Sequence, residues 1–430
     1  MNVSLKYGRG EVTLDIPDEN VKGVLEPAAS LPPIDDLGAA VKGVLSNPTA
    51  GPSLEAIVKE RGGAEKLRSV VIIVNDMTRS TPSDLVLPAM LEELKRLGVR
   101  QEAITIVVAT GTHRPMTDAE TSKTVGEAVF KSYRVENHNC DSPDLVDMGT
   151  LSTGNRMIVN RTVAEADLRL SVGEVLLHYY AGFAGGRKSV FPGVSARDTI
   201  MRNHAQMTMP GVGIGLLEGN RLYAETDEAV EKFCPLHFIV NLVCDTHKRV
   251  VRVVGGHFRD AWLEGVKTFR EMNFVKIDAP ADAVIASAGG FPKDINMYQA
   301  HKGIYMASRA VRHDGAMVFL AALEEGFGHK VFAEWAERGW TPSKVREEFE
   351  KKFTFGAHKL YYLADHALNF KMYLVSEMNQ EQSRLMFCEK IAPGAVLQTL
   401  KAKLGNAFQV YIIPQGGIVL PTLPTLEGSC

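Results

Sequence analysis

The strongest constraint on the fold is a repeated alternation between strongly apolar runs and segments with helical periodicity. The runs SVVIIV (69–74), ITIVVA (104–109) and LRLSVGEVLL (168–177) are mainly apolar, as expected for strands buried on both faces of a sheet. Helical patterns follow the first two runs, at 82–98 and 118–132. This alternation predicts an α/β fold with mostly parallel, helix-covered sheets.

The length of the chain favours two domains, because 430 residues exceed what one hydrophobic core usually serves. A second series of strands and helices begins after FVKIDAP (274–280). We therefore expect an N-terminal cofactor-binding α/β domain over 1–274 and a C-terminal α/β domain over 275–430, with the active site in a cleft between them. The Gly- and Pro-rich tail after residue 414 is a candidate for crossing back to the first domain.

Composition limits the class of partner. The chain is 45% hydrophobic and 23% charged, with a net charge of −3, so it has no basic excess that would favour nucleic acid or an anionic membrane. It also has no apolar run of about 18 residues and no signal-peptide pattern at its start. The five cysteines are dispersed without a C-x-x-C pair, which indicates free thiols. We expect a cytoplasmic protein that binds neither nucleic acid nor membrane.

Charged and histidine side chains gather where the first-domain strands end. These residues are Asp76, Thr78 and Arg79 after the first strand, His113 and Arg114 after the second, and His178 after the third. Ligands of open parallel sheets bind outside the carboxyl ends of the strands. The pattern therefore predicts a functional site at this edge of the sheet.

The stretch AGFAGGRKSVFPG (181–193) resembles a Walker A phosphate loop, G-x-x-x-x-G-K-[ST], at Gly182, Lys188 and Ser189. The residue before the lysine should be a glycine, but it is Arg187, which argues against a triphosphate site. His204 follows Lys188 by sixteen residues and has no partner at the spacing of a zinc motif. If His204 binds a metal, the other ligands must come from elsewhere.

In the second domain, Gln299 and Lys302 are spaced to share one face of the helix predicted through 298–310. A carboxylate-binding pair and a solvated pair both fit this pattern. The sequence leaves five further residues without an assigned role: Lys293, His358, Lys359, Tyr361 and Tyr362.

Taken together, these clusters resemble the motifs of the nickel-dependent lactate racemase family, in order and in approximate spacing, over about residues 69–310. The matching motifs are D-M-T-R at 76–79, G-T-H-R at 111–114, H-Y-Y-A-G-F-A-G-G-R-K at 178–188, N-H at 203–204 and Y-Q-A-H-K at 298–302. The resemblance implies an isomerase that racemises or epimerises a 2-hydroxy acid, such as lactate.

The resemblance further implies a nickel-pincer nucleotide, a pyridinium mononucleotide with two sulfur-bearing arms, as the cofactor. Lys188 would be its covalent attachment point and His204 the protein ligand to nickel. His113 and His178 would be the two bases of a proton-coupled hydride transfer through a 2-keto acid. The cofactor would be made by separate maturation enzymes.

Substrate and cofactor contacts are implied in the same way. Arg79, Gln299 and Lys302 would bind the substrate carboxylate, while Asp76, Thr78 and Arg79 would contact the cofactor and Asp76 would also orient Arg79. Three alternatives remain: an epimerase of a larger sugar acid (an aldonate), a P-loop-like nucleotide-binding enzyme, and a non-catalytic protein that stores nickel or the cofactor.

Overall fold

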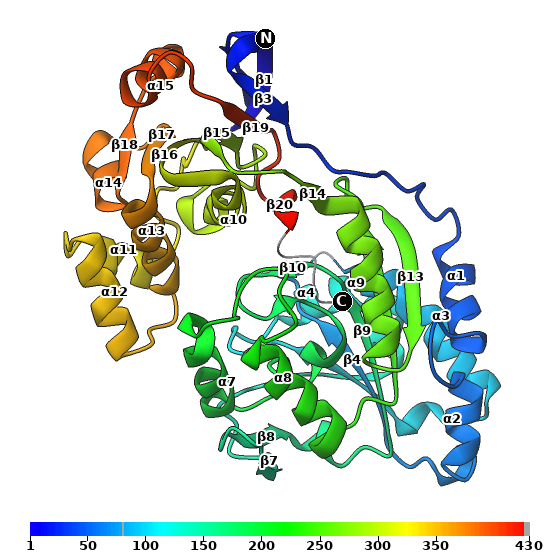
Figure 1. The fold of residues 1–430 in the computed structure, drawn as a ribbon. Coiled ribbons are helices and arrows are strands. Elements are labelled where there is room, and N and C mark those ends of the chain that lie inside the picture. Colours follow the sequence, from blue (N-terminus) through cyan, green and yellow to red (C-terminus); the bar gives the residue numbers. More distant parts are fainter. Residues whose placement is uncertain (80, 425–430) are drawn as a thin grey trace. The chain divides into compact units, whose positions relative to one another are not determined.

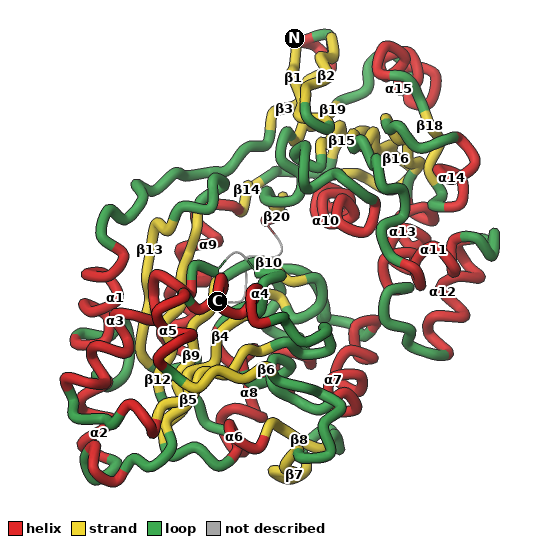
Figure 2. Tube along the Cα trace, turned by 180° about the vertical axis from the view of Figure 1, so that it is seen from behind, coloured by secondary structure: helices red, strands yellow, loops and turns green. Residues whose placement is uncertain are grey.

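The computed structural model describes residues 1–79 and 81–424, which fall into two compact units (Figure 1). The central unit comprises Ser30–Arg270, and the terminal unit comprises Met1–Ala29 together with the chain from Glu271 onward. Figure 2 shows the strands of each unit flanked by helices. The predicted class, α/β with mostly parallel, helix-covered sheets, is confirmed.

The sheet of the central unit has the strand order β13-β12-β9-β4-β5-β6. Its strands are β4 (Val70–Asn75), β5 (Ile104–Ala109), β6 (Arg134–Asn137), β9 (Leu168–Glu174), β12 (Phe238–Cys244) and β13 (Val250–Gly256). Neighbouring strands are parallel, apart from β12 and β13, which pair antiparallel. Along the chain, β5 and β6 are added on one side of β4, and β9, β12 and β13 are then added on the other side. The strand order therefore reverses between β4 and β9. Such a reversal is where open α/β sheets bind ligands.

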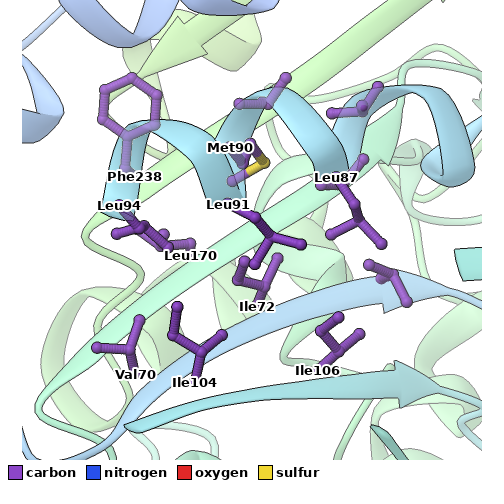
Figure 3. Close-up of a cluster of buried hydrophobic side chains, with 14 of the residues drawn as sticks. Val70, Ile72, Leu87, Met90, Leu91, Leu94, Ile104, Ile106, Leu170 and Phe238 are labelled. Atoms are coloured by element: carbon purple, nitrogen blue, oxygen red, sulfur yellow. The ribbon is translucent and has the colours of Figure 1, made fainter. Parts of the chain in front are cut away.

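Helix α3 (Ser83–Arg96) covers one face of this sheet (Figure 3). Leu87, Met90, Leu91 and Leu94 recur at helical spacing and therefore line one side of the helix. They are buried in one cluster with side chains from β4, β5 and β9, namely Val70, Ile72, Ile104, Ile106 and Leu170 (Figure 3). Burial of each such side chain contributes about 1.5–3 kcal/mol, which makes the sheet a rigid base for the loops at its edge.

One helical prediction in this unit differs from the structure. The segment expected as one helix over 118–132 is divided into α4 (Asp118–Val125) and α5 (Glu127–Ser132), because Gly126 adopts a φ of +89°, a conformation that a helix cannot contain. The stretch 31–66 contains two further helices, α1 (Leu37–Ser46) and α2 (Leu54–Glu60).

The terminal unit has a second sheet in the order β18-β17-β16-β15-β19-β3, with parallel pairing throughout. Its strands are β3 (Val21–Val24), β15 (Ala281–Ser287), β16 (Val311–Leu320), β17 (Lys371–Val375), β18 (Cys388–Lys390) and β19 (Val410–Ile413). Its helices include α10 (Met297–Ala307), α11 (Lys330–Ala336), α12 (Pro342–Lys351), α13 (His358–Asn369), α14 (Gln380–Leu385) and α15 (Val396–Leu404).

The observed division differs from the expected one at the start of the chain. The boundary near residue 270 lies close to the expected 274, but residues 1–29 belong to the terminal unit and not to the first domain. The reason is packing: the hairpin of β1 (Asn2–Tyr7) and β2 (Gly10–Asp15) buries its apolar side chains in the terminal unit's core, and β3 pairs with β19.

The tail does not leave the terminal unit within the described residues. Strand β20 (Leu420–Thr422) pairs in parallel with β14 (Phe274–Lys276), which belongs to the same unit. The last part of the expected crossing, residues 425–430, lies outside the described residues. Within 1–79 and 81–424, no helix combines the length and apolarity that crossing a membrane requires.

The central unit contains further short elements outside its main sheet. They are β7 (Leu145–Thr150), β8 (Arg156–Asn160), α6 (Arg161–Ala164), β10 (Leu177–His178), β11 (Gly182–Phe183), α7 (Arg197–His204) and α8 (Arg221–Glu228). Helix α9 (Asp260–Asn273) runs across the boundary between the two units.

Candidate functional site at the edge of the central sheet

Asp76 and His113 form a hydrogen-bonded pair at the ends of two adjacent strands. Asp76 directly follows β4, and its buried carboxylate lies 2.6 Å from Nδ1 of His113, which follows β5. The hydroxyl of Thr78 donates to the other carboxylate oxygen at 2.6 Å. Burial alone would raise the pKa of Asp76, but the hydrogen bonds from His113 and Thr78 outweigh it and hold the pKa below its usual value. The carboxylate is therefore ionised and orients the imidazole.

The two arginines of this edge have different surroundings. Arg79 is exposed, and its backbone NH closes a turn on the carbonyl of Asp76 at 3.1 Å. Its charge lies close enough to Lys188 to lower the pKa of that amine. Arg114 instead forms a two-pronged ion pair with Glu120 of α4, at 2.7 and 2.6 Å. Arg114 thus stabilises the start of α4, and only Arg79 is associated with the cluster.

His178 and His204 are connected through a tyrosine. His178 ends β10, which forms a short hairpin with β11. The ring of Tyr180 lies edge-on to His178 at 4.6 Å between centroids and to His204 at 4.8 Å. Tyr180 is buried and the His204 side chain is 7% exposed. The chain thus brings together two histidines that are 26 positions apart in sequence, with one aromatic ring as the spacer.

The loop that carries Lys188 is fixed by internal packing. Its backbone turns through Gly185 at a φ of +87° and passes so close to β12 that a Cβ at this position would lie 2.6 Å from Oδ1 of Asn241. The same oxygen accepts a hydrogen bond from the NH of Gly186 at 2.7 Å. A glycine is therefore required at position 185, because β12 leaves no room for a side chain there.

Arg187, the residue that departs from the Walker A pattern, points into the protein interior. It is 1% exposed, its guanidinium lies 4.0 Å from the ring centre of Tyr223 and 4.3 Å from that of Trp262, and its Nε donates to Thr226 at 3.0 Å. Arg187 therefore anchors the loop to the protein interior. Lys188, the next residue, is partly buried.

Burial and charge keep Lys188 and His204 toward their neutral forms. Burial, with Arg79 and Arg187 adding to it, lowers the pKa of Lys188 well below its usual value. Burial and the nearby Lys188 lower the pKa of His204 to about 3, against a smaller opposing effect of the Ile200 carbonyl. A neutral imidazole is the form that binds metals, and a neutral amine is the form that makes covalent bonds.

The donor set around His204 limits how a metal could be held. Within the described ranges, no three side chains from His, Cys, Asp and Glu come together in a way that could hold a metal ion. A metal on His204 would therefore need its other donor atoms from a bound group. A cofactor that supplies three donors of its own is compatible with this arrangement, whereas a zinc site built from protein side chains alone is not.

The remaining predicted residues lie in the terminal unit, on α10. Gln299 is exposed in the first turn, and its NH donates to the capping side chain of Asn296 at 3.0 Å. Lys302, one turn further, is partly buried. Lys359, at the start of α13, is buried; its amine donates to the carbonyl of Tyr298 and lies 4.2 Å from the centre of that ring. Burial and the neighbouring Lys302 lower the pKa of Lys359 to about 7.

The other unassigned residues have structural surroundings. Lys293 is exposed in the turn after β15, while His358, Tyr361 and Tyr362 are buried in α13. Tyr361 packs against Phe349 with ring centroids 4.9 Å apart.

Sequence reasoning missed Asn241, the residue that fixes the Lys188 loop. A signal was present, because this asparagine interrupts the otherwise apolar strand FIVNLVC. A fully buried amide in the middle of a strand needs hydrogen-bond partners, and Asn241 finds one in the loop.

Fold and site together define an α/β enzyme with a histidine- and lysine-bearing edge at the strand reversal of its central sheet. Residues 7–215 match the lactate racemase N-terminal domain, and residues 276–420 match the lactate racemase C-terminal domain. The chain belongs to the lactate racemase family, and it is an isomerase of the racemase type.

Relatives of known name support this assignment over nearly the whole chain. A lactate racemase of Thermoanaerobacterium thermosaccharolyticum is 29% identical over 432 aligned positions, which cover 97% of this chain and 99% of that protein. A lactate racemase of Lactiplantibacillus plantarum is 33% identical over 77% of both chains. The solved structure of the lactate racemase apoprotein from T. thermosaccharolyticum aligns with a TM-score of 0.89 at 30% identity, covering 98% of this chain and 100% of that one.

Proposed function

We propose that this enzyme racemises lactate or another short 2-hydroxy acid by proton-coupled hydride transfer, with a nickel-pincer nucleotide tethered to Lys188. The observation that carries the proposal is the association of an Asp76–His113 pair, a His178–Tyr180–His204 ring chain and Lys188 at one edge of the central sheet. Names of related proteins support the substrate class.

The chemistry of the substrate favours hydride over proton transfer. Removing the Cα proton of a 2-hydroxy carboxylate would create a second negative charge beside the first. If the Cα–H electron pair leaves as hydride while a base takes the hydroxyl proton, the Cα–O bond becomes a ketone and no second charge forms. Return of the hydride to the opposite face, with return of the proton to the oxygen, gives the other enantiomer. When bound, the cofactor would supply the hydride acceptor.

Two bases are required, one for each enantiomer, and imidazoles suit both roles. We assign these roles to His113 and His178. For His113 the hydrogen-bond partner determines the reactive atom: the ionised Asp76 can only accept, so Nδ1 of His113 carries the hydrogen and Nε2 has the free lone pair. Asp76 thus acts as the residue that orients the base, as the acid of a catalytic triad does.

Lys188 and His204 would hold the cofactor, Lys188 as its covalent attachment point and His204 as the one protein ligand to nickel. Asp76, Thr78 and Arg79 form the turn beside Lys188 and would contact the cofactor.

Arg79 would also bind the substrate carboxylate, and Gln299 and Lys302 of the terminal unit would do the same. We further propose that separate maturation enzymes are partners, because a tethered nucleotide of this kind must be made before it is attached, and that the protein works in the cytoplasm.

Single substitutions of the two histidines test the proposal. We expect His113→Ala and His178→Ala each to lower kcat for both enantiomers by about 10²–10⁴-fold, the usual effect of removing a general base. The measurement is the approach to racemic equilibrium from each pure enantiomer, with nickel content determined on the same samples. His247→Ala is a matched control, because its side chain is 76% exposed. Near-wild-type turnover in either catalytic variant would contradict the two-base assignment.

A further inference from the structure

The end of helix α7, which carries His204, is held by a buried carboxylate on α8. Glu225 is 1% exposed, and its carboxylate oxygens accept hydrogen bonds from three neutral side chains. Nδ2 of Asn203 donates at 2.5 Å, Nε2 of Gln206 donates at 3.0 Å, and the hydroxyl of Thr153 donates to the second oxygen. The carboxylate is thus surrounded by donors from the segments on either side of His204.

These contacts fix the orientation of the Asn203 amide. A carboxylate can only accept hydrogen bonds, so Asn203 must turn its NH₂ group toward Glu225. With the amide in the opposite orientation, its carbonyl oxygen would face the carboxylate, and two buried acceptors would be left without a donor between them, which is unfavourable. The carbonyl oxygen of Asn203 is therefore directed to the other side, toward the ring of His204.

The amide orientation in turn selects the tautomer of His204. Oδ1 of Asn203 lies 3.3 Å from Nδ1 of His204. The amide oxygen can only accept, so this contact favours the tautomer in which Nδ1 carries the single hydrogen of the neutral ring. Nε2 then has a free lone pair. Ligands to metals are commonly oriented in this way, by an acceptor on the nitrogen that does not bind the metal.

We infer that Glu225 and Asn203 are positioning residues that hold His204 as the Nδ1–H tautomer, with the Nε2 lone pair available to a metal. The metal in question is the nickel of the proposed function, so the inference rests on that proposal for its purpose. The tautomer itself is a property of this chain and can be measured without any metal.

Nitrogen-15 NMR of the histidine rings in the full-length, cofactor-free protein measures the tautomer directly, because protonated and bare ring nitrogens resonate in separate regions. The spectrum of His204→Gln assigns the His204 signals by their loss. In the wild-type protein we expect Nδ1 to be the protonated nitrogen. A wild-type spectrum with the hydrogen on Nε2 would overturn the inference, whether or not any variant folds.

Four variants separate positioning from a merely structural role. Asn203→Leu removes the acceptor and Glu225→Leu removes the group that orients it; both should shift the tautomer ratio toward Nε2–H. The shift should be partial, because the Ile200 carbonyl is a second acceptor for the ring. Glu225→Gln retains an acceptor oxygen for Asn203 and should keep the wild-type ratio. Glu228→Gln, on the same helix but bonded to Ser152, is the matched control and should also keep it.

An unchanged tautomer ratio in folded Asn203→Leu would refute the positioning role of Asn203. Nickel content of the same proteins, purified from a host that makes the cofactor, is the separate test of the proposed function. If the protein contains no nickel but the wild-type His204 ring carries its hydrogen on Nδ1, the proposed function is contradicted, whereas the positioning role of Glu225 and Asn203 is not.

Discussion

At the scale of single residues, the site depends on acceptors that determine where imidazole hydrogens lie. Asp76 does this for His113 through a 2.6 Å contact. In Asp76→Asn the amide can turn its NH₂ toward Nδ1 and so favour the tautomer with the hydrogen on Nε2. We expect kcat to fall by about 10²-fold or more, since the base is held in the unreactive tautomer. Steady-state kinetics in both directions measure this effect. Asp118→Asn, at an exposed position of α4, is the control, and an unchanged kcat in Asp76→Asn would contradict the role.

His366 illustrates a different consequence of burial, on stability. It is 6% exposed in α13, and burial lowers its pKa to about 4. Between pH 4 and its unfolded value of about 6.5, the unfolded chain binds the proton and the folded chain does not, so stability falls as the pH falls through this window. The slope from one such histidine is at most about 1.4 kcal/mol per pH unit.

His366→Phe should reduce this slope, because phenylalanine cannot titrate and fits beside Phe370, whose ring lies 5.6 Å away. Urea unfolding at several values between pH 4.5 and 6.5 measures the slope, with the exposed His247→Gln as the control. An identical slope in wild type and His366→Phe would show that His366 does not contribute.

At the scale of elements, the loop 185–189 is held in place by β12. Gly185→Ala would place a Cβ 2.6 Å from the Asn241 side chain and 3.0 Å from the Glu174 carbonyl, at a φ of +87°. Gly154→Ala is a matched control, with a φ of +80° but no atom within 4 Å of the new Cβ. In both variants the free energy of unfolding should fall by about 1–3 kcal/mol, the cost of a non-glycine residue in the left-handed region. In urea unfolding, Gly185→Ala should be measurably less stable than Gly154→Ala. Equal losses would mean that the loop moves freely away from β12.

The elements themselves were largely predictable, and their contacts were not. The apolar runs over 69–74 and 104–109 nearly coincide with β4 and β5, because strands buried on both faces must be apolar along their length. The clusters around Asp76 and His113 follow from parallel pairing, which brings both strand ends to one edge. Their hydrogen bond, and that of Glu225 with Asn203, depends on side-chain directions that spacing does not encode. Burial of Arg187 likewise could not be read from a motif that resembled a phosphate loop.

At the scale of the whole molecule, the first 29 residues complete a core formed mainly by the last part of the chain. Deletion of residues 1–29 removes β3 from the edge of the second sheet and the β1–β2 hairpin from its hydrophobic core. Hydrogen exchange of the truncated protein should show lost protection in β15, β16 and β19, whereas β4, β5 and β9 keep theirs. Loss of protection in the central sheet to the same degree would contradict the division into these two units.

The central claim is that Lys188 carries a nickel-binding nucleotide on which racemisation depends. The most direct measurement is the mass of the peptide containing Lys188, together with nickel content, in active enzyme purified from a host able to make the cofactor. We predict a mass increment on this peptide and nickel in the wild-type protein, with neither the increment nor activity in Lys188→Ala. Full racemase activity from a protein whose Lys188 is unmodified and which contains no nickel would contradict the account.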